Sequence, residues 1–134
     1  HKRLSEDRLK DKPDNCHLTG FIDFDEYVGL LRNADAVMAL TTRDGTLLSG
    51  GFEAVSLERP LIVSDWPVLE DYFSKGTVYV DNTAEGIDEG IQYAIENKAV
   101  LNENIKELRR ILNQEWKQSG EQVNHMIQEF VLSR

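Results

Sequence analysis

Short apolar runs that alternate with helical patterns constrain the fold of this chain more than any other feature. Residues 36–40 (AVMAL) form one such run, and residues 61–63 (LIV) and 77–80 (TVYV) form two more. A continuous apolar run is typical of a strand that is buried on both faces, as in a parallel sheet. A further short strand is predicted over residues 16–19, where Gly20 ends it.

Helical patterns lie between these runs and after them. Apolar residues at helical spacing predict helices over residues 23–34, 52–57 and 87–95. Residues 99–132 are expected to form C-terminal helices, with one apolar stripe over residues 101–112 and another over residues 123–130. A weakly amphipathic helix is predicted before Pro13.

The helix starts also carry capping signals. Asp23 and Glu26 have the spacing of a capping box, and Asn82 or Thr83 is expected to cap the helix that follows.

This alternation predicts an α/β fold with a Rossmann-like parallel sheet and helices on both faces. The 134 residues are enough for one hydrophobic core, so residues 1–134 are interpreted as a single domain. Sheets of this kind bind ligands at the carboxyl ends of their strands, where the strand order reverses. The loops after Gly20, Leu40, Val63 and Val80 are therefore the first candidates for a site.

Charge and composition limit the class of partner. The formal net charge of −9 disfavours binding to nucleic acid, because an acidic surface repels the phosphate backbone. Cys16 is the only cysteine, which excludes an internal disulfide and fits a reducing compartment, with the cytoplasm as the expected location. The polar, abrupt start of the sequence suggests a piece of a longer protein, truncated at its N-terminus.

Residues 41–53 (TTRDGTLLSGGFE) leave a predicted strand and enter a predicted helix, and this loop is the main candidate for chemistry. Gly50 and Gly51 would let a ligand approach the backbone, and the first N–H groups of the helix would attract an anion such as a diphosphate. Ser49 would cap the helix or donate its hydroxyl, and Glu53 would accept hydrogen bonds from ribose hydroxyls. The alternative is that this glycine pair forms only a flexible turn.

The stretch FEAVSLERPLIVSD, residues 52–65, resembles the donor-site signature of GT-B glycosyltransferases of the retaining, glycogen-synthase-like kind. In that family a Glu-Ala pair is followed by Pro, an apolar strand and Ser-Asp. The preceding blocks agree in order, with Gly20-Phe21 after a strand and residues 33–36 (NADA) before the next. Trp116 also lies where the family has a tryptophan in its final helices. The resemblance covers most of the chain, from about Asn15 to Phe130.

The resemblance implies that the chain is the C-terminal, donor-binding half of a GT-B fold. It would bind a nucleotide-diphosphate sugar for metal-independent glycosyl transfer, in polysaccharide or glycoconjugate biosynthesis, with no cofactor. The acceptor would be bound by an N-terminal domain, and the full-length protein could associate with a membrane. As a fragment, the chain is expected to show little activity without that domain.

The family's functional residues map onto this sequence only in part. Glu53 matches the ribose-binding glutamate, and Gly20 and Phe21 fall where the backbone meets the base. Gly45 stands where the family has its first glutamate, so the neighbouring Asp44 is the candidate to hold the donor sugar.

Three residues of the loop after the predicted strand at 36–40 complete the candidate site. Gly45 and Thr46 would lie near the phosphates or the sugar. Arg43 would stabilise the charge on the departing phosphate; the alternative is an ordinary solvated arginine.

Departures from the family pattern keep other functions open. Glu58 replaces a common glycine, and a left-handed conformation there would cost about 1 kcal/mol relative to Gly. The turn at Ser49-Gly50-Gly51 is similar to that of UDP-sugar 2-epimerases, which favours an epimerase as one alternative. Gly45 and Glu58 favour another, a non-catalytic GT-B-like scaffold domain. A phosphate-receiver domain has a comparable topology, but the expected acidic pair is missing.

The sequence Asp23-Phe24-Asp25 spells the metal-binding Asp-x-Asp of another glycosyltransferase fold. Its position at a predicted helix start favours capping, and no metal site is expected.

Overall fold

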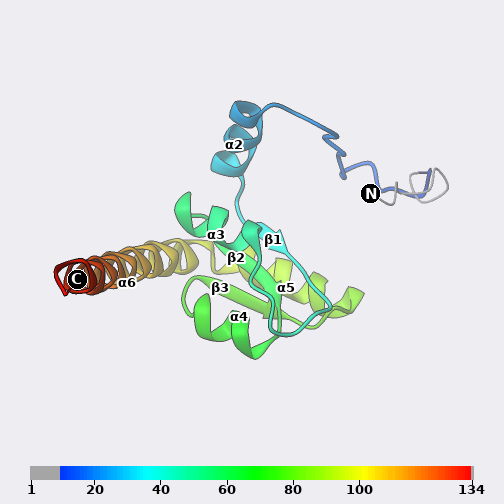
Figure 1. The fold of residues 1–134 in the computed structure, drawn as a ribbon. Helices are drawn as coiled ribbons and strands as arrows, with labels where there is room; N and C mark the ends of the chain where they lie inside the picture. Colours follow the sequence, from blue (N-terminus) through cyan, green and yellow to red (C-terminus); the bar gives the residue numbers. More distant parts are fainter. Residues whose placement is uncertain (1–9, 134) are drawn as a thin grey trace.

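The computed structural model describes residues 10–133, which form an α/β domain around a small parallel sheet (Figure 1). The helix predicted before Pro13 lies almost wholly outside the described residues. The sheet contains β1 (Val37–Ala39), β2 (Leu61–Ser64) and β3 (Thr77–Val80), in the order β1-β2-β3. All neighbours are parallel, with Val37 opposite Leu61 and Leu61 opposite Thr77.

Helices connect and cover these strands. In chain order they are α2 (Phe24–Asn33), α3 (Ser49–Ser56), α4 (Pro67–Tyr72), α5 (Ala84–Glu96) and α6 (Lys98–Leu132). Because β1, β2 and β3 follow one another in the same direction across the sheet, right-handed crossovers place α3 and α4 on one face. Helix α5 covers the other face, so the predicted α/β sheet with helices on both faces is confirmed.

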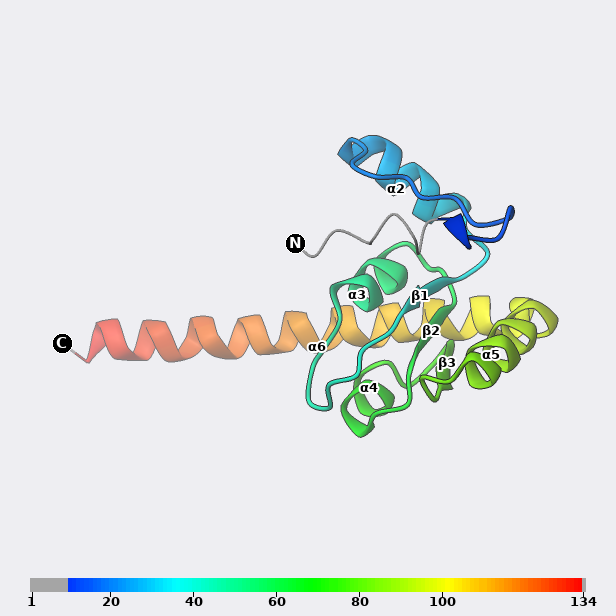
Figure 2. The same ribbon diagram turned by 90° about the vertical axis from the view of Figure 1, so that its right-hand side faces the viewer.

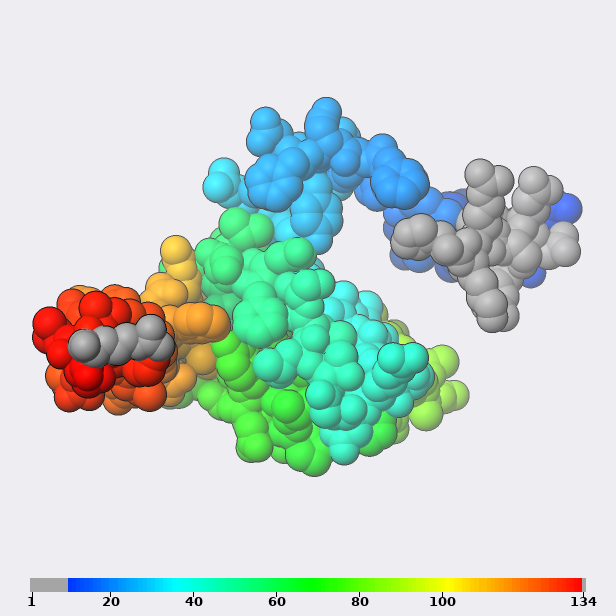
Figure 3. All heavy atoms as spheres, viewed as in Figure 1, coloured from blue at the N-terminus to red at the C-terminus, as the bar shows by residue number. Residues whose placement is uncertain are grey.

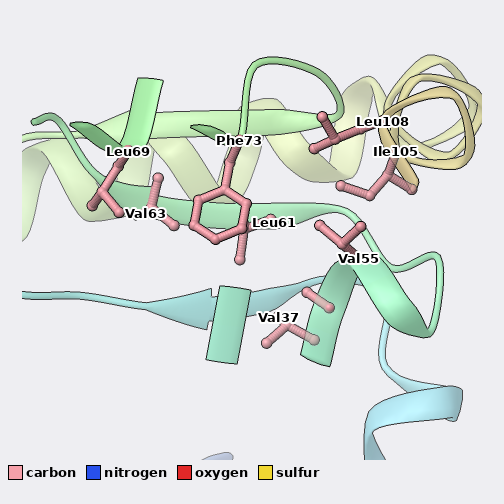
Figure 4. Packing of buried hydrophobic residues seen from close by; sticks show 9 residues of the cluster. Val37, Val55, Leu61, Val63, Leu69, Phe73, Ile105 and Leu108 are labelled. Atoms are coloured by element: carbon pink, nitrogen blue, oxygen red, sulfur yellow. The ribbon is translucent and has the colours of Figure 1, made fainter. Parts of the chain in front are cut away.

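Two clusters of buried side chains lie on opposite faces of β2. Leu61 and Val63 face α3 and α4 and pack with Val55, Leu69 and Phe73 (Figure 4). Ile62, between them, points the other way and packs with α5. This alternation follows from the strand period of two and makes β2 the one strand buried on both faces.

The apolar run at residues 36–40 was predicted to be buried on both faces, and that prediction was wrong. β1 forms an edge of the described sheet, and α5 lies over β2 and β3, so the side chain of Met38 remains 44% exposed. β3 forms the other edge and alternates between buried and half-buried residues.

The predicted strand at residues 16–19 is also absent. These residues form irregular, exposed backbone that pairs with no strand in the described part of the chain. Nor does the order of the three strands reverse, so the described sheet has no switch point to mark a ligand site.

The C-terminal helices predicted over residues 99–132 form one continuous helix, α6, of 35 residues, and its buried residues all lie in its first half. Ile105 and Leu108 are buried in the cluster with α3 and α4, and Leu101 is buried in the cluster with α5. A side chain at Gly76, just before β3, would collide with the backbone of Ile105. The second half projects away from the domain (Figures 1 and 2). No helix within residues 10–133 has the length and apolar character needed to cross a bilayer.

Glu58, which follows the C-terminal end of α3, connects this part of the chain to α6 through an ion pair. Glu58 adopts the left-handed conformation with φ of 55°, where the resemblance favours glycine. Its Oε1 accepts a hydrogen bond of 2.9 Å from Nη1 of Arg109 in α6. This ion pair offsets part of the cost of the left-handed backbone.

The capping predictions had mixed outcomes. Thr83 caps α5, and its hydroxyl accepts the N–H of Gly86 at 3.0 Å. Asp23 occupies the N-cap of α2, but its side chain makes no capping hydrogen bond.

Candidate functional site

A network of hydrogen bonds ties together the carboxyl ends of the three strands. Ser64, at the end of β2, is fully buried, and its Oγ accepts the N–H of Thr41 at 2.8 Å. The Ser64 hydroxyl donates to Oδ1 of Asn82 at 2.7 Å. Nδ2 of Asn82 and Nε1 of Trp66 each donate to the Thr41 carbonyl at 3.0 Å. The network fixes the start of the loop that follows β1.

Beyond this network lies an open hollow of about 450 Å³. Its lining comes from the end of β1, the following loop and the start of α5, and comprises Leu40, Thr41, Thr42, Arg43, Asn82 and Ile87. Arg43 is therefore a cationic residue at this edge of the sheet. The other predicted donor-site residues do not line the hollow.

Asp44 and Gly45 form a tight turn in the same loop. Oδ1 of Asp44 accepts the N–H of Gly45 at 2.7 Å, and Gly45 has a φ of 73°, which favours glycine. The Asp44 carboxylate thus stabilises its own loop. Thr46 is half-buried just after this turn.

The two glycines of α3 face the interior of the protein, contrary to the prediction that they open the backbone to a ligand. A Cβ atom at Gly51 would lie 2.5 Å from Cζ of Phe73, and one at Gly50 would lie 3.2 Å from Cβ of Ala39. These glycines let α3 pack closely on β1 and on the Phe73 ring. Their positions are explained by packing without any ligand.

Helix α3 begins one residue earlier than a Ser49 cap would require. Leu48 is the N-cap, and Ser49 is the first, exposed residue of the helix. The N–H of Gly51 donates to the Leu48 carbonyl at 3.0 Å, so the N–H groups of Ser49 and Gly50 are the ones left at the helix start. The predicted capping by Ser49 was wrong, but the predicted helix N-terminus at the end of β1 is present.

Glu53 lies one turn further along α3 and faces α2. Oε2 of Glu53 accepts a hydrogen bond from the hydroxyl of Tyr27. The two residues line an apolar groove of about 260 Å³ between the helices, whose walls also include Phe24, Val28, Leu31, Phe52, Ser56 and Leu57. Figure 3 shows α2 standing apart from the rest of the domain except where it approaches α3.

The contact with Glu53 raises the pKa of the Tyr27 hydroxyl. The pKa of the Tyr27 hydroxyl is raised above 10.0, first by its hydrogen bond to Glu53, then by burial and by the charge of that carboxylate. Tyr27 therefore remains a hydrogen-bond donor at neutral pH.

The carboxyl groups of Asp65 and Glu70 form a pair just beyond the end of β2. The pKa of Glu70 in α4 is raised because its carboxyl shares a hydrogen bond with Asp65, with smaller contributions from burial and from the charges of Asp65 and Asp71. The pair also lies near Tyr79, whose pKa is raised to about 12, mainly by burial and then by the charges of Glu70 and Asp65. This arrangement makes the carboxyl of Glu70 easier to protonate than that of a free glutamate.

Gly20 and Phe21 are not brought to the strand ends. They precede α2, Phe21 is fully exposed, and a Cβ atom at Gly20 would meet nothing within 4 Å. Figures 1 and 2 show the segment before α2 on the opposite side of the domain from the loop after β1.

The structure thus places the predicted site residues in separate parts of the domain. Arg43 lies in the hollow at the strand ends, Glu53 lies in the groove between α2 and α3, and the start of α3 adjoins the end of β1.

The sequence interpretation did not assign two parts of this arrangement. Ser64 ends one strand and Asn82 follows the next, so both could have been recognised as polar residues at the carboxyl ends of adjacent parallel strands. Tyr27 lies at helical spacing with other apolar residues of the helix predicted over residues 23–34, and nothing local to it indicates the contact with Glu53.

Within residues 10–133 no three His, Cys, Asp or Glu side chains form a group that could hold a metal ion. Comparisons of the chain with protein-family models, curated proteins and solved structures found no match.

Proposed function

We propose that the chain is the donor-binding domain of a GT-B glycosyltransferase, which binds a nucleotide-diphosphate sugar for metal-independent transfer to an acceptor. The observation that carries this proposal is the groove between α2 and α3. It combines apolar and aromatic walls, suited to a nucleoside base, with one carboxylate, that of Glu53. Ligand sites commonly have this composition, with mostly apolar walls and a few polar groups that fix orientation.

The geometry of α3 supports the same assignment. The ribose would donate hydrogen bonds to Glu53, and the diphosphate would lie at the N–H groups of Ser49 and Gly50 at the start of the helix. Arg43, in the adjoining loop, would approach the leaving phosphate and stabilise its charge. The acceptor and any general base would come from an N-terminal domain.

Calorimetric titration with UDP, GDP and ADP tests the proposal. One of the three should bind, and Glu53→Ala should weaken that binding by about 1–3 kcal/mol, because a charged hydrogen-bond acceptor is lost. Glu96→Ala, which removes an exposed carboxylate at the far end of α5, is the matched control and should leave binding unchanged. Failure of all three diphosphates to bind the folded chain would overturn the proposal.

A non-catalytic scaffold domain is the second candidate, and the inward packing of Gly50 and Gly51 favours it. That packing gives the glycine-rich turn a structural purpose, which also weakens its value as a sign of epimerase chemistry. A full-length protein that binds no nucleotide would support the scaffold function. Conversion of one UDP-sugar into another without an acceptor would support the epimerase.

A further inference from the structure

The carboxylate of Glu53 is oriented from outside its own helix. The Tyr27 hydroxyl, which comes from α2, donates to Oε2 of Glu53. No other side chain within residues 10–133 hydrogen-bonds to this carboxylate. Since each carboxylate oxygen can accept two hydrogen bonds, Oε1 and one lone pair of Oε2 remain for a ligand.

The hydrogen bond between Tyr27 and Glu53 joins α2 to α3, and α2 is otherwise only lightly packed against the domain. No residue of α2 is buried, and Leu31 is the α2 residue that packs against the main core cluster. Tyr27 is 36% exposed, so its ring forms one wall of the groove while its hydroxyl reaches the carboxylate. A glutamate side chain on a helix surface rotates freely unless a partner holds it, and Tyr27 supplies that partner.

We propose that Tyr27 is a positioning residue, which holds the Glu53 carboxylate in the orientation that accepts both hydroxyls of a ribose. This inference rests on the proposed function, because it assumes that Glu53 binds the ribose of a nucleoside diphosphate. Tyr27 acts through Glu53 and does not itself need to touch the ribose. It therefore determines selectivity for a ribonucleotide over a 2′-deoxyribonucleotide.

The affinities for a ribonucleotide and for its 2′-deoxy form together show whether Tyr27 orients the Glu53 carboxylate or only packs against the ligand. With Glu53 held in place, loss of the 2′-hydroxyl removes a hydrogen bond to a charged acceptor and should weaken binding roughly tenfold or more. With Glu53 released, each ribose hydroxyl gains less from the carboxylate, so ribonucleotide and deoxyribonucleotide affinities should converge. A residue that only lines the groove would change both affinities by the same factor.

The experiment measures the dissociation constants of the full 134-residue chain for UDP, GDP and ADP and for their 2′-deoxy forms. The variants are Tyr27→Phe, which keeps the ring and removes the hydroxyl, and Glu53→Gln. The matched control is Tyr93→Phe, which removes a hydroxyl from an exposed tyrosine on α5. Circular dichroism verifies that every variant keeps its helices.

The expected result is a preference for the ribonucleotide of roughly tenfold in the wild type and the Tyr93→Phe control, reduced to about threefold or less in Tyr27→Phe. Glu53→Gln should reduce both the affinity and the preference. If Tyr27→Phe keeps the preference, or weakens both ligands equally, the positioning role is wrong while the nucleotide site stands. If the wild type binds none of the diphosphates, the proposed function fails and the inference fails with it.

Discussion

The two halves of α6 carry similar apolar patterns but have different surroundings. In the first half, Ile105 is 0% exposed because it packs in the buried cluster with residues of the sheet, α3 and α4. In the second half, Ile127 is 54% exposed, although Val123, Met126 and Phe130 repeat near it at the same helical spacing. Figure 2 shows the first half passing behind the other elements of the domain and the second half extending beyond them.

This difference shows that apolar residues at helical spacing predict which face of a helix is apolar, but not whether that face is buried. An apolar side chain contributes to stability only when folding removes it from water. The stability of this domain should therefore depend on the sheet, α3 to α5 and the first half of α6. Matched substitutions in the two halves test that conclusion.

The largest expected effect comes from the pair Ile105→Ala and Ile127→Ala. Ile105→Ala removes buried methyl groups and leaves a cavity, so it should lower the free energy of unfolding by about 2–5 kcal/mol. Ile127→Ala removes exposed apolar surface and improves helix propensity, so its effect should lie within about 0.5 kcal/mol of zero. Urea unfolding followed by circular dichroism measures both. Equal losses would mean that the second half of α6 is buried in solution.

Alanine substitutions at Gly51 and Gly120 should change the free energy of unfolding in opposite directions. Gly51→Ala would place a Cβ atom 2.5 Å from Phe73 Cζ, and the strain should cost about 1–3 kcal/mol. At Gly120, in the second half of α6, an added Cβ atom meets nothing within 4 Å. Gly120→Ala should therefore raise stability by about 0.5–1 kcal/mol through helix propensity. Thermal unfolding of the two variants against the wild type tests this, and a stabilising Gly51→Ala would contradict the close packing of α3.

Tyr79 provides a test of the packed region at alkaline pH. Its hydroxyl donates to the Phe73 carbonyl at 2.6 Å, and burial and nearby carboxylates raise its pKa from 10.0 to about 12. The neutral phenol is favoured in the folded state, so this contribution is complete below pH 10 and is lost as the pH rises to about 12. Tyr79→Phe should cost about 1 kcal/mol at neutral pH through the lost hydrogen bond.

Comparing the free energy of unfolding of Tyr79→Phe with that of the wild type between pH 10 and pH 12 separates the contribution of Tyr79 from that of the other tyrosines. The other tyrosines are present in both proteins, so the stability gap between the two should narrow between pH 10 and pH 12. A gap that stays constant in urea unfolding over that range would contradict the raised pKa.

The smallest effect is expected at the contact between Glu58 and α6. Arg109→Gln removes a partly exposed ion pair and should lower stability by about 0.2–1 kcal/mol. High salt should reduce the difference between variant and wild type, because it screens the pair. The matched change in the second half, Lys117→Gln, should show no measurable effect. A salt-independent loss at Arg109 would assign its contribution to packing of the aliphatic stem instead.

Local patterns predicted most of the elements correctly. The apolar run after Pro60 is a strand buried on both faces, and the helices after β1 and β3 occur as expected. Thr83 caps α5, and Glu58 adopts the left-handed backbone. These features depend on residues close together in the sequence, so the sequence carries enough information to predict them.

Errors arose where a distant partner decides the outcome. Residues 16–19 have a strand-like composition but no strand to pair with in the described chain, and Met38 is exposed because β1 lies at the sheet edge. The predicted opening of the backbone at Gly51 failed because Phe73, over twenty residues later, occupies that space.

The sequence alone determined the α/β class, the parallel character of the sheet and most helix positions, because these follow from hydrophobic periodicity and local backbone preferences. It also identified Arg43 and Glu53 as candidate groups by their type and spacing. Only the tertiary structure decided that these two residues lie in different hollows, that Ser64 and Asn82 join the strand ends, and that Tyr27 meets Glu53. The physical reason is that such contacts depend on how helices pack against the sheet, and packing joins residues whose separation in the sequence gives no sign of it.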